Sequence, residues 1–210
     1  MNMDTKVARQ VQTEHDFEGL RQQIAQCTKC ALHQGRTNAV FGDGNLGAQI
    51  MCIGEGPGYY EDLQGRAFVG KSGQLLDKIF EACGFTRQEH VFIGNIVKCR
   101  PPNNRDPLPG ERAACLPYLY TQIDWIDPRI IILLGATALK GLIDPNARIT
   151  RVRGEWMQWR GRWVMPTYHP SALLRNPQLK RAAWEDFKKV IDKYRELVDP
   201  GHHTRHYPVP

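Results

Sequence analysis

Short apolar segments that alternate with longer helix-like segments constrain the fold of this chain most strongly. Residues 49–53, 91–97 and 130–134 are apolar runs of strand length, and each leads into a glycine or a polar loop. Strands that alternate with helices are typical of a parallel sheet covered by helices. In such sheets, ligands bind at the loops that follow the carboxyl ends of the strands. The pattern therefore predicts an α/β fold with a site at the strand ends.

The helices follow from periodicity and capping. Ser72 is suited to begin a helix that runs to Cys83 and stops at Gly84, because its apolar residues recur on one stripe. The other expected elements are helices over residues 136–142 and 178–197, and a hairpin with arms at 155–158 and 162–167. We expect the second arm of the hairpin to join the sheet.

The length of 210 residues suits one domain, expected over residues 1–200, with 201–210 as a flexible tail. The longest apolar run, residues 130–139, is flanked by Arg129 and Lys140 and is too short to span a bilayer. The N-terminal residues contain no signal-peptide core. We therefore expect a cytoplasmic protein with no membrane partner, in a compartment where thiols are normally reduced.

Four of the six cysteines are spaced like ligands. They are the C-x2-C pair Cys27 and Cys30, together with Cys99 and Cys115. A tetrahedral zinc ion and an iron–sulfur cluster both accept four cysteine ligands, so the residues alone leave both open. The other two, Cys52 and Cys83, are expected in the core as small apolar residues.

Positive charge is concentrated in the second half of the chain. The net charge is +6, whereas residues 1–100 carry equal numbers of acidic and basic side chains. Residues 148–181 hold eight basic residues and one acid, interleaved with Trp156, Trp159, Trp163 and Tyr168. A basic stretch attracts phosphate backbones, and aromatic rings beside cations suit nucleic acid. A solvated charged face with tryptophans in the core is the alternative interpretation.

Three long motifs occupy the loops after the expected strands and their surroundings. They are GEGPGYYED with QGRAFVGKSGQLL, then FIGNIVKCRPPNNRDPLPGE, and finally PTYHPSALLRNP. In sequence and order they closely resemble the motifs of the family 4 uracil-DNA glycosylases, the iron–sulfur class. The resemblance extends from Cys27 to the final helix. It implies a three-layer α/β/α fold with a central, mainly parallel four-stranded sheet.

The resemblance also implies an activity and a cofactor. The expected enzyme is a monomer that flips uracil out of DNA, hydrolyses its N-glycosidic bond and leaves an abasic site, without lyase activity. A 4Fe-4S cluster is implied, with Cys27, Cys30, Cys99 and Cys115 as its ligands. Uracil in duplex DNA and in single-stranded DNA are both open as substrates.

Two residues are expected to act on the glycosidic bond. His169 matches the family residue that donates to uracil O2 as negative charge develops on the departing base. Backbone N–H groups of the glycine-rich loop, around Gly54 and Gly56, can assist. The best-known uracil glycosylases carry an aspartate where this chain has Gly56, so Glu55 is the nearest candidate to orient the attacking water.

Other residues are expected to recognise the base. Phe68 matches the family's stacking residue, Asn95 the residue that pairs with N3–H and O4 of uracil, and Glu61 the residue that excludes the methyl group of thymine. A wedge must also fill the space that the flipped base leaves. Leu173 is the expected wedge, with Leu174 as the next choice.

Three other classes of function are weighed against hydrolysis. A related group of proteins becomes covalently trapped on uracil-DNA through a histidine between the last two cluster cysteines. Residues 99–115 contain no histidine, which favours turnover. A zinc-bearing nucleic-acid module without catalysis leaves the HPS and GEGPG loops unexplained. Dinucleotide binding by the glycine-rich loop is disfavoured, because no acidic residue follows the second strand at the expected position.

Overall fold

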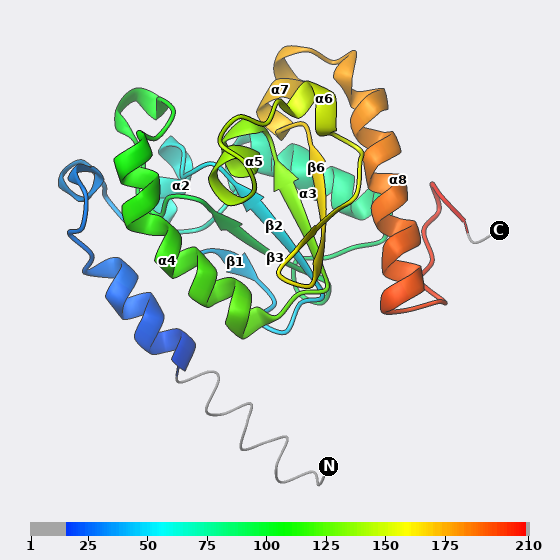
Figure 1. Ribbon diagram of the computed structural model, residues 1–210, viewed down its shortest axis with the longest axis horizontal. Helices are drawn as coiled ribbons and strands as arrows, with labels where there is room; N and C mark the ends of the chain where they lie inside the picture. Colours follow the sequence, from blue (N-terminus) through cyan, green and yellow to red (C-terminus); the bar gives the residue numbers. More distant parts are fainter. Residues whose placement is uncertain (1–15, 209–210) are drawn as a thin grey trace, which may run out of the picture.

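The structure is a computed structural model that describes residues 16–208, and it forms a sheet between two layers of helices (Figure 1). The described part of the first helix covers residues 16–25. The elements that follow are η1 (Ala31–Gln34), β1 (Asp43–Gly44), β2 (Ile50–Gly54), α2 (Tyr59–Gln64), α3 (Lys71–Cys83), β3 (Val91–Asn95), η2 (Pro102–Asn104), α4 (Pro109–Ile126), β4 (Ile130–Leu134), α5 (Ala136–Leu142), α6 (Ile149–Val152), β5 (Met157–Trp159), β6 (Arg162–Thr167), α7 (Pro170–Arg175) and α8 (Leu179–Leu197).

The sheet has the strand order β1-β3-β2-β4-β6-β5. Its four inner strands are parallel, whereas β1 and β5 pair antiparallel at the two edges. The predicted α/β fold with a parallel four-stranded centre is confirmed, as is the hairpin whose second arm joins the sheet. The two short edge strands bring the number of strands in the sheet to six.

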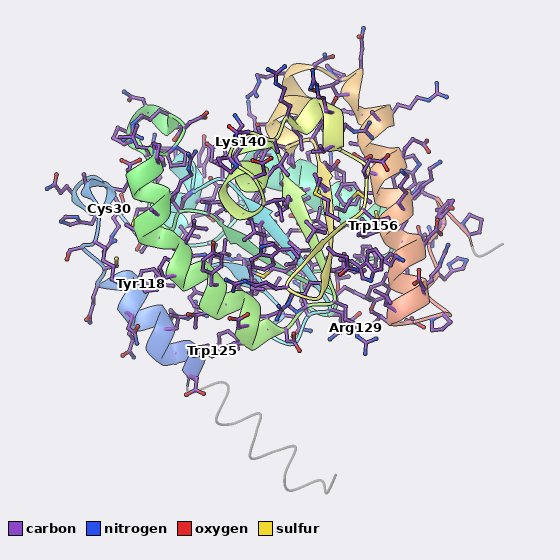
Figure 2. The ribbon with its side chains drawn as sticks, viewed as in Figure 1. Cys30, Tyr118, Trp125, Arg129, Lys140 and Trp156 are labelled. Atoms are coloured by element: carbon purple, nitrogen blue, oxygen red, sulfur yellow. The ribbon has the colours of Figure 1, made fainter. Side chains whose placement is uncertain are left out.

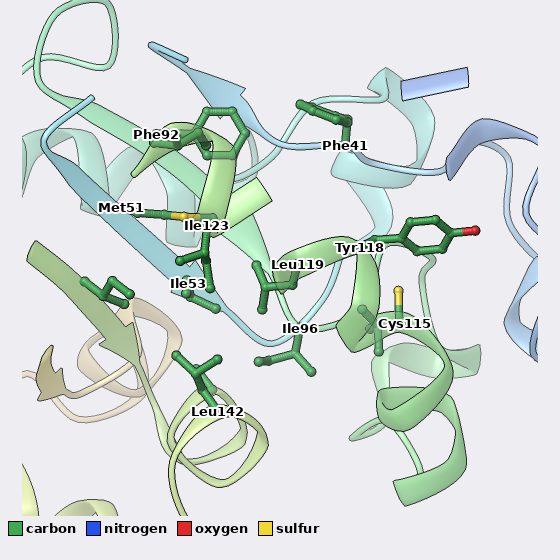
Figure 3. Packing of buried hydrophobic residues seen from close by; sticks show 14 of the residues in the cluster. Phe41, Met51, Ile53, Phe92, Ile96, Cys115, Tyr118, Leu119, Ile123 and Leu142 are labelled. Atoms are coloured by element: carbon green, nitrogen blue, oxygen red, sulfur yellow. The ribbon is translucent and has the colours of Figure 1, made fainter. Parts of the chain in front are cut away.

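Alternate residues of each inner strand face opposite layers. Met51 and Ile53 of β2 lie in one apolar cluster with α4, α5 and the first helix, whereas Ile50 and Cys52 lie in the other with α3 and α8. Figure 3 shows part of the first cluster, including Met51, Ile53 and Leu119. Because both faces are covered, the strands contain apolar residues at successive positions.

Helix α4 was not predicted from the sequence, for two reasons. Pro117 stands inside it, and its apolar residues do not follow a single stripe. It lies between the first helix and the sheet (Figure 1), so that it is covered on more than one side. Its first turn is fixed by Glu111, whose carboxylate accepts the backbone N–H of Leu108 at 2.7 Å and pairs with Arg105.

Several element boundaries differ from the sequence prediction by one or two residues: β2 covers residues 50–54, β5 covers 157–159, and α8 begins at Leu179. Strand β3 ends at Asn95 rather than at residue 97, and the backbone N–H groups of Ile96 and Val97 donate to the carbonyl oxygens of Gly54, the last residue of β2, and of Glu55. Helix α3 begins at Lys71 with Gly70 as its N-cap, two residues before the expected cap at Ser72. The shift in β3 places Asn95 directly at the end of its strand.

The segment expected to be a flexible tail is packed against the body as far as the structure describes it. His202 and Thr204 are buried and contact the last carbonyls of α3: the His202 ring lies 2.8 Å from Cys83 O, and Thr204 Oγ1 donates to Ala82 O at 2.5 Å. Arg195 of α8 donates to His202 O at 3.0 Å. The segment thus satisfies carbonyl groups that a helix end leaves unpaired. Residues 209–210 lie outside the described part.

Between residues 16 and 208 the structure has no helix with the length and apolar content that crossing a bilayer requires.

Candidate active site

The loops after β2, β3 and β6 meet at one end of the sheet and enclose a cavity of about 510 Å³, called here the strand-end pocket. Most of the residues predicted for catalysis and base recognition line it. They are Glu55, Gly56, Glu61, Phe68, Asn95 and His169, and other lining residues include Tyr59, Tyr60, Arg105, Ser171 and Arg175. Residues from distant parts of the sequence thus converge as the topology predicts.

Asn95 presents an unpaired acceptor to this pocket. Its side chain is 3% exposed, and its Oδ1 is buried without a hydrogen-bond partner among the described residues. A buried polar atom without a partner is costly unless a ligand completes it. Gly54 allows the close approach, since a Cβ there would lie 2.6 Å from Asn95 Oδ1 and 2.7 Å from Phe68 Cζ.

Phe68 is held in a strained backbone conformation. Its φ is 54°, which is rare for a residue with a bulky side chain, and it lies over Gly73, where a Cβ would come within 1.8 Å of Phe68 O. Arg87 stabilises this turn. Its guanidinium donates to Ala67 O at 2.8 Å and to Phe68 O at 2.7 Å, and pairs with Asp43.

Arg87 was missed by the sequence analysis, because it acts from the loop before β3 through contacts distant in sequence. Its Nε also donates to Asp77 of α3 at 2.7 Å, so one side chain joins β1, α3 and the Phe68 turn. Hydrogen bonds to the two carboxylates raise the pKa of Arg87, although burial opposes them. Arg87 therefore remains charged and fixes the aromatic wall of the pocket.

Glu61 has a backbone-holding role in addition to facing the pocket. Its Oε1 accepts the N–H groups of Val69 and Gly70 at 2.9 and 2.8 Å. The carboxylate thereby ties α2 to the turn that follows Phe68. This places its bulk beside the ring on which a base would stack.

His169 caps α7 in a defined tautomer. The backbone N–H of Ser171 donates to Nδ1 at 3.1 Å, and Ser171 Oγ lies 2.8 Å from the same atom. Because Nδ1 accepts from a backbone N–H, the ring proton resides on Nε2. Burial, helped by Arg175, lowers the pKa of His169 to about 4, so the ring is neutral at pH 7. Its centroid lies 5.6 Å from that of Phe68.

Glu55 is oriented by a residue that the sequence analysis did not identify. Thr137, in the first turn of α5, donates its hydroxyl to Glu55 Oε2 at 2.5 Å. Burial raises the pKa of Glu55, and the Thr137 hydrogen bond opposes that shift. The second carboxylate oxygen is then left to accept from a water or a ligand.

The four cysteines predicted as ligands line a single small cavity, the cysteine cavity, between the first helix and α4. Figure 2 shows Cys30 and Tyr118 on that side of the molecule. Arg36 donates to Cys99 Sγ at 3.0 Å, and the backbone N–H of Lys98 donates to Cys115 Sγ at 3.2 Å. Such donors stabilise thiolates, the form in which cysteine binds metals. Burial raises the pKa of the free Cys115 thiol to about 11.

The arrangement of these thiols leaves the kind of occupant open. Across residues 16–208, no three His, Cys, Asp or Glu side chains gather closely enough to hold one metal ion. A zinc ion and an iron–sulfur cluster both accept four cysteine ligands.

Lys98 connects the cysteine cavity to the strand-end pocket. Its buried Nζ donates to Asn95 O at 3.0 Å and to Gln122 Oε1 at 2.5 Å. Gln122 in turn donates to Phe41 O at 2.8 Å. Lys98 thus fixes the backbone that carries both Asn95, predicted to recognise the base, and Cys99, a predicted ligand.

Comparisons with known proteins agree with this geometry. The model of the uracil DNA glycosylase superfamily matches residues 41–188. A type-4 uracil-DNA glycosylase of Thermotoga maritima is 48% identical over 181 residues, which cover 84% of this chain and 94% of the relative. One of Sulfurisphaera tokodaii is 45% identical over 200 residues, 91% of this chain and 89% of the relative. The chain belongs to the type-4 uracil-DNA glycosylase family.

A type-5 uracil-DNA glycosylase of Pyrobaculum aerophilum is more distant, with 30% identity over 174 residues and 75% of each chain covered. The predicted resemblance to family 4 is confirmed. The fold also has the layers and the parallel centre that the resemblance implied. Membership of the family does not by itself assign a role to any individual residue of this chain.

The two leucines considered as the wedge differ in exposure. Leu173, the expected residue, is 1% exposed, whereas Leu174 is 44% exposed. Successive residues of a helix point about 100° apart, so the two side chains of α7 face different surroundings. Of the two, Leu174 is the leucine at the surface.

Several residues of the basic stretch, residues 148–181, pair or pack within the fold. Arg153 pairs with buried Asp186, and Arg162 pairs with Asp127 at 2.8 Å. The rings among them pack into the fold: Trp156 and Trp163 form an edge-to-face pair with centroids 5.9 Å apart, and Trp159 stacks on Tyr120. The other basic residues of the stretch are exposed: Arg148, Arg151, Arg160, Arg175, Lys180 and Arg181.

Proposed function

We propose that this protein removes uracil from DNA by hydrolysing the bond between N1 of the base and C1′ of the deoxyribose, and that it leaves the DNA strand intact. The observation that carries this proposal is the unpaired Asn95 Oδ1 in the strand-end pocket, where a ligand N–H must complete it. Uracil N3–H supplies that donor, and the amide Nδ2 of Asn95 can donate to O4. Cytosine has no proton on N3, so it is rejected.

The neutral His169 supplies the stabilisation of the leaving group. The electron pair of the N1–C1′ bond leaves with the base, and negative charge accumulates on O2. A fixed Nε2–H donor stabilises that charge most in the transition state, when the charge is largest. A neutral donor suffices, because the proton need not be transferred for the uracil anion to depart.

Water completes the hydrolysis. Its oxygen bonds to C1′, and Glu55, oriented by Thr137, accepts a hydrogen bond from it and takes up the released proton. Phe68 stacks on the extruded ring, and Glu61 beside it leaves no space for a 5-methyl group. Leu174 enters the vacated stack, since it is the exposed leucine of α7.

We propose a 4Fe-4S cluster in the cysteine cavity, held by Cys27, Cys30, Cys99 and Cys115. When bound, the cluster supplies covalent cross-links between the N-terminal segment and α4. The chain's own part is to hold the thiolates with Arg36 and the Lys98 backbone, and to keep Asn95 in place through Lys98 Nζ. We also propose that the protein acts as a monomer.

The deciding experiment measures free uracil and strand breaks from uracil-containing oligonucleotides. The parent protein should release uracil with repeated turnover and leave abasic strands that break only after alkali. His169→Ala should lower the single-turnover rate by about 100-fold with DNA affinity nearly retained, the scale of one lost oxyanion donor. Ser171→Ala is the matched control, because the backbone N–H of residue 171 still holds Nδ1. Parental rates for His169→Ala would refute the assigned role.

Asn95→Asp tests separately how the pocket distinguishes uracil from cytosine. It should lower uracil release, and it should admit cytosine, because a protonated carboxyl donates to cytosine N3 while its carbonyl oxygen accepts from N4–H2. A covalent complex in place of free uracil would instead favour the trapped binder over the enzyme.

A further inference from the structure

Two neighbouring tyrosines stand exposed at the rim of the strand-end pocket. Tyr59 and Tyr60, here the tyrosine pair, open α2 and are 51% and 55% exposed. Their rings meet edge to face with centroids 5.4 Å apart. Six large apolar side chains are exposed in the described part of the chain, and these two lie beside a pocket whose other walls serve catalysis. Neither has a role in the reaction derived above.

The exposure of the pair does not come from a loose helix. On the same helix, Glu61 accepts the backbone N–H groups of Val69 and Gly70, and buried Asp62 accepts that of Thr37 at 2.9 Å. With the N–H of Asn38, which also donates to Asp62, helix α2 is therefore anchored on its polar side by four backbone donors. The backbone that carries the two rings is thus fixed at the pocket mouth.

The surroundings of the pair carry cations. The Arg100 guanidinium lies 5.0 Å from the centroid of the Tyr59 ring, and Lys71 and Arg175 line the same pocket. Aromatic faces beside cations form the combination that binds unpaired bases and their phosphates. The tryptophans of the basic stretch also have cations over their rings, but they are only half-exposed and pack against other side chains, whereas the tyrosine pair is exposed at the pocket.

Extrusion of a base creates a partner for such rings. When uracil occupies the pocket, an adjacent base loses one stacking neighbour, and in single-stranded DNA no opposite strand supports it. We propose that the tyrosine pair stacks on the base adjacent to the extruded uracil and thereby strengthens the binding of single-stranded uracil-DNA. This rests on the proposed function, since it needs uracil in the strand-end pocket. Leu174 fills the gap on the side of α7, whereas the pair acts from α2.

A coupling experiment between protein and DNA tests this contact. Substrates are single-stranded oligonucleotides with one uracil, in which the base on the 5′ side, the 3′ side or neither is replaced by a tetrahydrofuran spacer. Proteins are the parent, Tyr59→Ala/Tyr60→Ala, Tyr59→Phe/Tyr60→Phe and the control Leu63→Ala, a residue of α2 that is 48% exposed but does not line the pocket. The half-saturating protein concentration and the maximal single-turnover rate are measured for each pair.

For the parent, removal of the contacted neighbour should raise the half-saturating concentration by about 10-fold, within the range of one base–aromatic stack. The double alanine variant should bind the intact strand about 10-fold more weakly and should lose less than about 2-fold more when that base is removed. Maximal rates should not change. The double phenylalanine variant and Leu63→Ala should behave like the parent.

If base removal weakens the alanine variant as much as the parent on both the 5′ and the 3′ side, the pair does not stack on a neighbouring base and the proposal is wrong. If the parent releases no uracil from any strand, the proposed function itself fails. The two failures are therefore separable in one set of reactions.

Discussion

The strand-end pocket and the cysteine cavity share one continuous segment, residues 95–99, but they differ in whether their polar groups already have hydrogen-bond partners. The pocket contains a buried oxygen without a partner, a strained Phe68 and a neutral His169. The cysteine cavity has donors already directed at sulfur, from Arg36 and the Lys98 backbone. The pocket leaves polar groups for a transient ligand to complete, whereas the cavity holds groups suited to a permanent one.

This difference indicates which changes each region tolerates. In the pocket, a lost donor should slow a chemical step and leave the fold intact. In the cysteine cavity, a lost thiolate should release the occupant and loosen the first helix and α4, which meet there (Figure 1). Because Lys98 contacts both regions, we expect it to transmit changes from one to the other.

The largest expected effect lies in the cysteine cavity. Cys99→Ser should remove the iron, which we expect at about four atoms per chain in the parent. It should also lower the melting temperature, because metal binding contributes to folding. Iron analysis and thermal unfolding check this. Cys83→Ala is the control, since Cys83 is buried in the opposite apolar cluster. Stoichiometric zinc without iron in the parent would contradict the cluster.

A smaller effect is expected for Arg87, which supports the Phe68 turn of the strand-end pocket. Arg87→Met should leave Phe68 O, Ala67 O and Asp43 without their donor, and should lower the free energy of unfolding by about 3 kcal/mol. The relaxed Phe68 turn should weaken stacking on uracil, so inhibition by free uracil should need about 10-fold more of the base.

Arg66→Gln is the matched control for Arg87→Met. Arg66 also pairs with Asp43, but its side chain is largely exposed, and its guanidinium donates to Asp43 rather than to the carbonyl groups of the Phe68 turn. Equal losses of stability in the two variants, with unchanged uracil inhibition, would show that Arg87 only supports β1.

The pocket and the cavity also differ in how much of them the sequence revealed. The proximity of Asn95 and His169 was predictable, because each stands at or just after the end of a strand and the ends of parallel strands meet, whereas their roles were implied by the resemblance. The cysteine set was predictable from spacing, with the resemblance needed to choose iron. Arg87 and Thr137 were not, since a side chain that acts through contacts distant in sequence leaves no local pattern. The choice between Leu173 and Leu174 depended on the register of α7.

The elements of the fold likewise divide into those that the sequence revealed and those that it did not. Inner strands were recognisable from apolar runs bounded by glycine or polar loops, whereas α4 was hidden by Pro117 and by burial on several sides. The packing of His202 against α3 could not be read from the terminal residues, because it satisfies carbonyl groups of a helix more than 100 residues earlier.

A pH profile separates the two titratable groups of the pocket. If ionised Glu55 orients the water, the single-turnover rate should fall as pH decreases through the pKa of Glu55, which burial raises. His169 stays neutral until about pH 4 and should not cause this fall. Glu55→Gln should be slower by about 10-fold and should lose the acid limb.

The stability of the Glu55→Gln variant checks the direction of the pKa shift of Glu55. A carboxyl whose pKa is raised in the folded protein stabilises it below the unfolded pKa, and that contribution is lost as pH rises through the folded pKa. At pH 7, Glu55→Gln should therefore be at least as stable as the parent. A less stable variant would mean that Glu55 mainly supports α5 through Thr137.

The smallest effect concerns how DNA reaches the pocket. Arg153 is unsuitable for this test, because its partner Asp186 is buried and would be left unpaired. Arg151→Gln/Arg175→Gln changes two exposed cations of the basic stretch, of which Arg175 lines the strand-end pocket. The slope of log affinity against log salt should become shallower by about 1 to 2, since each phosphate contact contributes about 0.9.

The control is Arg129→Gln/Arg160→Gln. Arg129 precedes β4, and Arg160 lies in the turn before β6, so both lie at the end of the sheet opposite the pocket. This pair should leave the salt slope unchanged. Because both double variants remove the same formal charge, a difference between them cannot come from net charge and must reflect position. Equal slopes would mean that the basic stretch is a solvated face, and that DNA approaches the pocket without phosphate contacts from Arg151 and Arg175.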